Sequence, residues 1–189
     1  PSSYRDMSAP AGDFEKIKQA SRIISEANKP VIIAGGGIKN TAGQTQALAL
    51  AEELNCPIVT SPGHGDAIAF SHPLNAGQMG PRGNIVASRL VKEADVILAL
   101  GTRLGFNSTF YSYDNINRDA KIIHVEIEPS AIGRFFPIEV GIWGDAPTIA
   151  KQLLNSLKLS SNRKLADKWT SQFQVERKRY LQKRDSDAI

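Results

Sequence analysis

Apolar positions along the chain follow two patterns, one typical of amphipathic helices and one typical of buried strands. Residues 13–28 carry apolar side chains every three or four positions, which predicts a helix with Asp13 as its N-cap. Asp145 is the predicted N-cap of a later helix. Further helices are predicted over residues 41–55, 84–94 and 145–157, and short, largely apolar runs predict strands over residues 31–34, 57–60, 95–100, 121–127 and 138–142.

The alternation of strands and helices predicts the fold class. Right-handed crossovers between successive strands give a parallel sheet, so we expect an α/β fold. The sheet should be doubly wound and Rossmann-like, with about five to six strands and helices on both faces. Two passages fall outside the pattern: residues 61–83 are rich in glycine and proline, and residues 106–119 are polar and aromatic, which predicts a loop.

Composition narrows the class of protein. The chain has 189 residues, 41% of them apolar and 22% charged, which suits one globular α/β domain. No apolar run approaches the roughly 18 residues of a membrane span, and residues 1–10 do not resemble a signal peptide. We therefore expect no membrane partner. One cysteine, Cys56, cannot form an internal disulfide, which favours a cytoplasmic location.

The net charge of +4 is concentrated near the C-terminus. Residues 160–189 hold eight Lys/Arg and four acidic residues, whereas the first 159 hold 15 of each sign. Because acids are interleaved and no nucleic-acid motif is present, we expect a solvated helix or a linker packed on a missing neighbour, and no nucleic-acid partner.

The division of the chain follows from these patterns. We expect an N-terminal linker over residues 1–12, a central domain over residues 13–158, and a basic helix or linker over residues 159–189 that leads towards a missing domain. The start at Pro1, without a Met, favours a piece of a longer protein.

Candidate chemistry lies where ligands of such sheets bind, beyond the carboxyl ends of the strands. Gly35, Gly36 and Gly37 follow the first strand and form either a pyrophosphate cradle or a turn that needs positive φ. Asn40 replaces the third glycine of the dinucleotide fingerprint. Arg103, after a later strand, is placed to bind phosphate or carboxylate, or to fix its loop through a salt bridge.

Other polar residues near strand ends give weaker signals. Glu126 and Glu128 should share one face of a strand, where carboxylates accept hydrogen bonds from ribose hydroxyls or cap a helix. Met79 is placed either to contact a planar ring or to pack in the core. The loop histidines His64 and His72 are more suggestive than core histidines, but structural roles are favoured.

The remaining candidates for chemistry give no site. The three histidines and the one cysteine lack metal-ligand spacing and nucleophile-triad partners, so we predict no metal site and no catalytic residue in this chain.

Several phrases of the sequence resemble one enzyme family. Residues 29–37, 51–60 and 94–103 resemble the central domain of thiamine-diphosphate-dependent enzymes, most closely the acetolactate synthase large-subunit type. Residues 124–129 and 144–146 fit in the same order and spacing, and the resemblance spans residues 13–157.

That resemblance implies a subunit with flanking pyrimidine- and diphosphate-binding domains, which hold thiamine diphosphate and Mg²⁺. The activating carboxylate and the metal motif lie in those domains, so this chain alone should be inactive. The parent would be a carboligase or decarboxylase that transfers an acetyl group from 2-oxo acids, assembled as a homodimer or homotetramer.

The resemblance also implies a nucleotide in the central domain, which binds FAD in acetolactate synthases and ADP in some relatives. By position, Gly35, Gly36 and Gly37 would face its pyrophosphate, with Arg103 alongside. Met79 would approach the ring, and Glu126 and Glu128 would lie near the ribose or flavin.

Residues 104–108 depart from the Phe-Asp-Asp-Arg loop of flavin-binding members, which leaves ADP or an empty site open. Residues 101–105 also resemble sulfoacetaldehyde acetyltransferase-like relatives, so the substrate stays open.

Two other classes of protein compete with this family. One is a free-standing NAD-dependent enzyme, which would need a complete dinucleotide fingerprint, and the other is an interaction module that docks through its basic helix.

Overall fold

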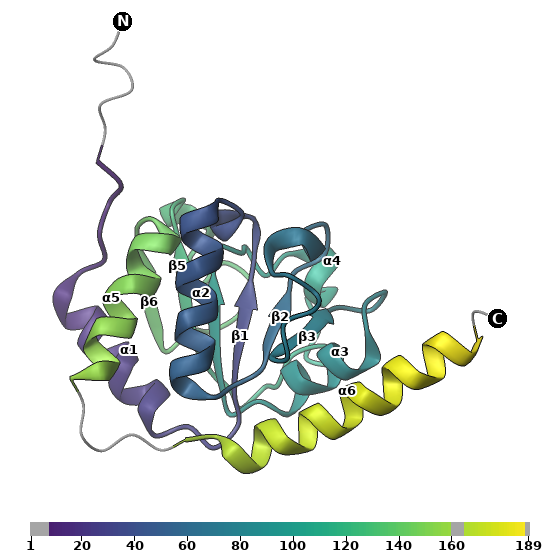
Figure 1. The fold of residues 1–189 in the computed structure, drawn as a ribbon. Coiled ribbons are helices and arrows are strands. Elements are labelled where there is room, and N and C mark those ends of the chain that lie inside the picture. The colour runs from purple at the N-terminus through teal and green to yellow at the C-terminus, as the bar shows by residue number, and fades with distance from the viewer. Residues whose placement is uncertain (1–7, 160–164, 188–189) are drawn as a thin grey trace, which may run out of the picture.

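A computed structural model describes residues 8–159 and 165–187. Its centre is a six-stranded, wholly parallel sheet, with the strands in the order β3-β2-β1-β4-β5-β6 (Figure 1). This confirms the predicted doubly wound α/β fold. The strands are β1 (Pro30–Ala34), β2 (Ile58–Thr60), β3 (Asn75–Gln78), β4 (Val96–Leu100), β5 (Lys121–Glu126) and β6 (Val140–Trp143).

Helices cover both faces of the sheet. Alternate residues of β1 belong to opposite cores: Ile32 and Ala34 pack with one set of helices, and Val31 and Ile33 with the other. The first set is α1 (Phe14–Ser25), α2 (Thr41–Leu54) and α5 (Ala146–Lys158); the second is α3 (Ile85–Glu93) and α6 (Asp167–Asp187). Strands buried on both faces explain the uninterrupted apolar runs of the sequence.

The two predicted N-caps are confirmed. The Asp13 carboxylate accepts the Lys16 amide hydrogen at 3.0 Å, and the Asp145 carboxylate accepts that of Thr148 at 3.0 Å. Each bond satisfies one of the free N–H groups in the first turn of a helix. These caps fix where α1 and α5 begin.

The passages without a clear pattern contain more structure than the sequence indicates. Residues 61–83 include β3 and the 3-10 helix η3 (Gly65–Ala67). The segment 106–119, predicted as a loop, begins with a one-turn helix, α4 (Phe106–Thr109), and further 3-10 turns are η2 (Gly36–Ile38) and η4 (Pro129–Ala131). The buried Asn75 amide holds β3 in place, because it donates to the Ile68 and Ala69 carbonyls at 3.1 and 3.2 Å.

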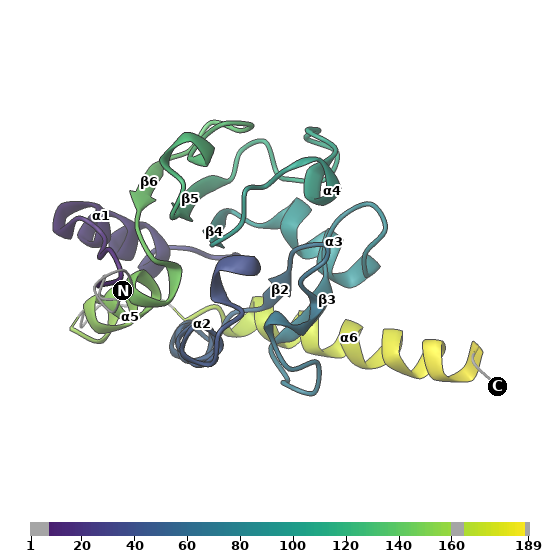
Figure 2. The same cartoon turned by 90° about the horizontal axis from the view of Figure 1, so that it is seen from above.

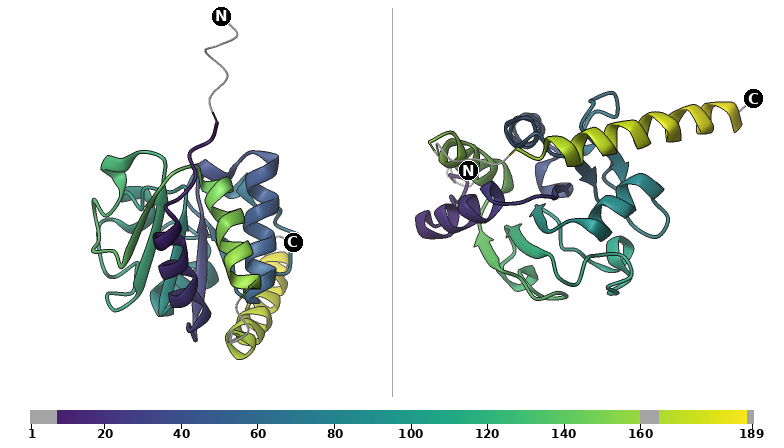
Figure 3. Two further views of the ribbon diagram at one scale, coloured as in Figure 1. Left: turned by 90° about the vertical axis from the view of Figure 1, so that its left-hand side faces the viewer. Right: turned by 90° about the horizontal axis from the view of Figure 1, so that it is seen from below.

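The first half of α6 packs against this domain, whereas the sequence predicts a solvated helix or one packed on a missing neighbour. Trp169 and Phe173 are buried, and the Trp169 indole donates to the Pro30 carbonyl at 3.1 Å. Arg177 donates to the carbonyls of Asn75 and Phe70 at 2.8 and 2.7 Å. Further along the helix, Tyr180 packs against the same core cluster and Arg184 lies over the Phe70 ring at 5.8 Å, while the C-terminal end of the helix extends past the sheet (Figure 3).

Two further expectations bear on the fold. Cys56 lies between α2 and β2 with its side chain fully buried, and burial raises the pKa of its thiol. The sulfur therefore stays protonated and inert at neutral pH.

Among the helices in residues 8–159 and 165–187, none combines the length and apolar character that crossing a membrane requires.

Candidate functional site

The strand order reverses between β1 and β4, and the loops after these two strands lie against each other. The Gly35 amide donates to the Leu100 carbonyl at 2.9 Å, and the Gly37 amide donates to the Gly101 carbonyl at 3.0 Å. A Cβ on Gly35 would lie 2.2 Å from the Gly101 carbonyl oxygen, and one on Gly37 would lie 2.8 Å from the Gly101 Cα. Glycine is therefore required at both positions for the loops to touch.

An open cleft of about 490 Å³ lies beyond this contact, at the carboxyl ends of the strands. Gly36 and Gly37 line it together with His64, Arg103 and Glu126. Figure 2 looks down on this edge of the sheet. Because the cleft lies at the topological switch point, it is where a doubly wound sheet binds its ligand.

Arg103 is the free cation of the cleft. Its side chain is exposed, and it forms no ion pair with any residue that the structure describes. The salt bridge that would fix its loop is thus not found in the described part of the chain. Its neighbour Leu104 is buried at a φ of 49°, in the left-handed region that costs a branched side chain energy.

His124 fixes the loop that carries Arg103. Its ring is buried beside β4, and it bonds the Thr102 carbonyl through Nε2 at 2.7 Å. The Gly133 amide donates to Nδ1 at 3.2 Å, so the ring is neutral, with its hydrogen on Nε2. Burial lowers the pKa of His124, although the bond to Thr102 and the nearby Glu126 carboxylate act in the opposite direction.

This lowered pKa predicts a loss of stability on acidification. The unfolded chain takes up a proton on His124 near its ordinary pKa of about 6.5, whereas the folded chain takes it up only at lower pH. We therefore expect the free energy of unfolding to fall below about pH 6.5. Urea titrations at several pH values should show a steeper fall for the native chain than for His124→Gln; parallel curves would contradict it.

The two predicted glutamates have different surroundings. Glu126 is buried at the floor of the cleft and accepts the Ile127 and Glu128 amide hydrogens at 3.0 and 3.4 Å. Glu128 instead caps η4, because its carboxylate accepts from the Ser130 amide and hydroxyl. Those bonds, and more weakly the charge of Arg103, lower the pKa of Glu128. The structure thus brings Glu126, and not Glu128, to the cleft lining.

Met79 lies inside the protein. Its side chain has no exposed surface and belongs to the core cluster that contains Val59 and Leu90. It does not line the cleft. A ring contact by Met79 stays a prediction that the packing in this structure does not support.

His64 was not selected from the sequence as a site residue, yet it lines the cleft. A Cβ on Gly36 would lie 2.8 Å from the His64 Cε1 atom, so the ring fills the space that Gly36 leaves free. Its Nδ1 atom is buried and has no hydrogen-bond partner in the described structure. The signal in the sequence is that His64 follows β2 at the same edge of the sheet.

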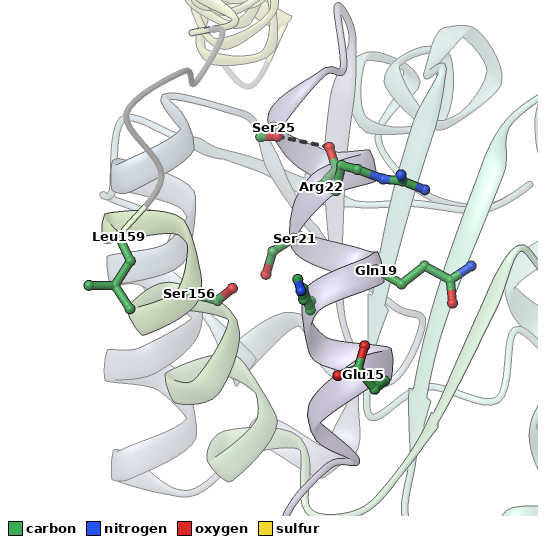
Figure 4. A pocket seen from close by; sticks show the side chains of 8 residues that line it. Glu15, Gln19, Ser21, Arg22, Ser25, Ser156 and Leu159 are labelled. Carbon is green, nitrogen blue, oxygen red and sulfur yellow. Dashed lines mark hydrogen bonds between the residues drawn. The ribbon is translucent and has the colours of Figure 1, made fainter.

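A second cavity of about 540 Å³ lies between α1 and α5 (Figure 4). Ser21 and Ser156 face it from the two helices. This cavity lies on the helical layer, away from the carboxyl ends of the strands, and none of the predicted site residues lines it.

We also find no group of three or more His, Cys, Asp or Glu that could hold a metal within residues 8–159 and 165–187.

Comparison with known protein families identifies one that matches most of the chain. Residues 17–153 match the family described as thiamine pyrophosphate enzyme, central domain. The chain belongs to this family. Two of the sequence segments that resemble the family form neighbouring parts of the sheet. Residues 29–37 form β1 and its glycine loop, and residues 94–103 form β4 and the loop that carries Arg103.

Curated relatives of this central domain include two kinds of enzyme. Sulfoacetaldehyde acetyltransferases of Roseovarius nubinhibens and Rhodobacter capsulatus are 42% and 39% identical over 80% of the chain. The acetolactate synthase large subunit of Corynebacterium glutamicum is 35% identical over 83% of it. The chain spans about a quarter of the length of these relatives, 26%, 26% and 25% respectively.

Proposed function

We propose that this central domain serves a thiamine-diphosphate-dependent acetyltransferase that acts on sulfoacetaldehyde. The observation that supports the substrate is the identity to five sulfoacetaldehyde enzymes, 36–43%, against 34–35% for three acetolactate synthase large subunits. The glycine–threonine–arginine–leucine–glycine phrase around Arg103 points the same way. Thiamine diphosphate and Mg²⁺ are then bound by flanking domains of the same protein, which is a homo-oligomer.

An acetolactate synthase-like parent that acts on 2-oxo acids is the second candidate, supported by the 35% identity. In either parent, thiamine diphosphate supplies the electron sink for the reaction. The residues of this chain would position the flanking domains, and the chain alone would be inactive.

The complete protein that contains this chain decides between the two. Purified with thiamine diphosphate and Mg²⁺ and supplied with an acetyl acceptor such as inorganic phosphate, it should consume sulfoacetaldehyde and be slow to release CO₂ from pyruvate. The reverse preference would favour the acetolactate synthase-like parent. Activity of the 189-residue chain by itself would contradict the architectural role.

We further propose that the cleft holds the phosphate groups of an adenine nucleotide, ADP or FAD. Arg103 supports this, because its guanidinium is exposed at the cleft and unpaired among the described residues. The amides of Gly35 and Gly37 are already bonded to the last residue of β4 and to the loop after it, so Arg103 and Gly36 would make the closest contacts. Met79, which was expected to contact the ring, has no exposed surface and packs in the core, so the proposal concerns the phosphates alone.

Replacing Arg103 with alanine tests this role. The charge-assisted bond it removes is worth about 1.5–3 kcal/mol, so the affinity for ADP should fall by that amount in calorimetric titration. Arg118, which stacks on Tyr113 outside the cleft, offers the matched Arg118→Ala control. An unchanged affinity of Arg103→Ala would show that Arg103 does not touch the nucleotide.

A further inference from the structure

Four aromatic rings form a continuous surface on and beside α4. The ring centroids lie 4.8 Å apart for Phe106 and Phe110, 5.6 Å apart for Phe106 and Tyr111, and 4.5 Å apart for Tyr111 and Phe135. Phe106, Phe110 and Tyr111 are 54%, 43% and 52% exposed. Single exposed apolar side chains are ordinary, whereas a contiguous group of them is typical of an interaction site. We call these four residues the α4 aromatic surface.

The backbone that presents these rings is strained. Phe110 and Tyr111 have φ values of 49° and 54°, in the left-handed region that disfavours residues with a Cβ. Phe110 ends α4 in this conformation, at a position where helices prefer glycine. The buried Thr109 fixes the turn, because its hydroxyl accepts the Tyr111 amide hydrogen at 3.1 Å and its carbonyl accepts from the Asn115 side chain at 3.0 Å. Strain that is held in place in this way is typical of functional segments.

The same edge of the sheet carries other exposed apolar side chains. Ile127 follows β5 and Trp143 ends β6; they are 51% and 54% exposed, and the Trp143 indole donates to the Ile127 carbonyl at 2.9 Å. The chain that leads into α1 also passes this edge. The Pro10 carbonyl accepts the Asp145 amide hydrogen at 2.8 Å, just after β6, and residues 8–12 rise past the sheet there (Figure 1). The exposed apolar residues and the chain that enters the domain thus share one side of it.

The charges around the α4 aromatic surface indicate the chemistry of its partner. A cavity of about 490 Å³ adjoins Phe106 and Phe110, and Arg82 is the one charged residue among the described residues that line it. Arg82 is exposed and forms no ion pair with any residue that the structure describes. Arg134 adds a second cation, with its guanidinium 5.4 Å from the centroid of the Phe135 ring. An apolar face that carries a carboxylate complements these residues.

We propose that the α4 aromatic surface packs against a flanking domain of the same protein, on an apolar face that places a carboxylate opposite Arg82. This inference rests on the proposed function, in which the central domain positions flanking domains. The chain spans about a quarter of the length of its curated relatives, so most of each relative lies outside the matched part. Packing of this kind removes the exposed rings from water and offsets the strain of the turn that presents them.

Hydrogen exchange of the complete protein and of the 189-residue chain tests this contact. The amides of residues 105–113 should exchange about tenfold more slowly in the complete protein, because the interface excludes water from them. Residues 84–89 surround Ile85, which is 73% exposed but lies outside the α4 aromatic surface, and they should exchange at the same rate in both. Equal exchange of residues 105–113 in the two proteins overturns the proposal and leaves the activity on sulfoacetaldehyde, which is assayed separately, untouched. Slow exchange without that activity overturns the proposed substrate alone.

Phe110→Gly separates the interface from the fold of this domain. Glycine adopts a φ of 49° freely, so the 189-residue variant should melt at the native temperature or above it. In the complete protein the same change removes a ring from the contact, so residues 105–113 should exchange nearly as fast as in the 189-residue chain. A lower melting temperature of the 189-residue variant would show that the ring serves the fold of this domain, and it overturns the proposal. Slow exchange that is lost when an oligomer dissociates on dilution assigns the surface to a second copy and also overturns it.

Discussion

Phe173→Ala should lower the free energy of unfolding by about 3–5 kcal/mol, the cost of removing a large aromatic ring from a packed core. The Phe173 ring has no exposed surface, and it lies in the same core cluster as Leu90 of α3 and Trp169. Its loss leaves a cavity between α6 and the sheet that small shifts cannot fill. Urea unfolding followed by circular dichroism measures the effect.

Val175→Ala is the matched control on the same helix. Val175 is 52% exposed, so its truncation should change the unfolding free energy by no more than about 0.5 kcal/mol. If Phe173→Ala unfolded at the same urea concentration as the native chain, α6 would be a detached linker. The expected large loss of unfolding free energy would show that α6 is part of the folded domain.

Gly35→Ala should cost about 3 kcal/mol, at the upper end for overpacking. The backbone of Gly35 has a φ of −103°, which alanine adopts freely, so the effect is steric. The new methyl group would lie 2.2 Å from the Gly101 carbonyl oxygen and 2.5 Å from the Thr102 Cβ. Both belong to the loop after β4, which has to move away, and the cleft changes shape with it.

Gly65→Ala gives the comparison for this variant. A Cβ at Gly65 would have open space around it, with no atom within 4 Å. We expect its melting temperature to stay close to that of the native chain, whereas Gly35→Ala should melt several degrees lower and bind ADP more weakly. Equal melting temperatures for the two variants would mean that the loops can separate without cost.

The sequence predicts most of the sheet because its strands are buried on both faces. Uninterrupted apolar runs mark β1 and β4, and the caps at Asp13 and Asp145 mark where α1 and α5 begin. The strand β3 escapes this reasoning because its residues include Asn75 and Gly77, which do not favour strands. Side-chain bonds of Asn75 and the distant Arg177 hold it in place instead.

The candidate site is predictable to the extent that topology fixes it. Arg103 follows a central strand, and the switch-point rule places it at the cleft. The positions of Met79 and His64 depend on tertiary packing, which neighbouring residues do not encode. Met79 turns into the core, and the contact of His64 with Gly36 joins residues 28 positions apart that share no local pattern.

The buried position of Cys56 allows its thiol to report local unfolding of the domain. It is the one cysteine in the sequence, and its protonated sulfur lies between α2 and β2 without access to solvent. A thiol-reactive dye therefore modifies only molecules whose core has opened, so the labelling rate measures how often the core opens. The opening rates of native and variant chains could then be compared without denaturant, by following the mass increase from one added label.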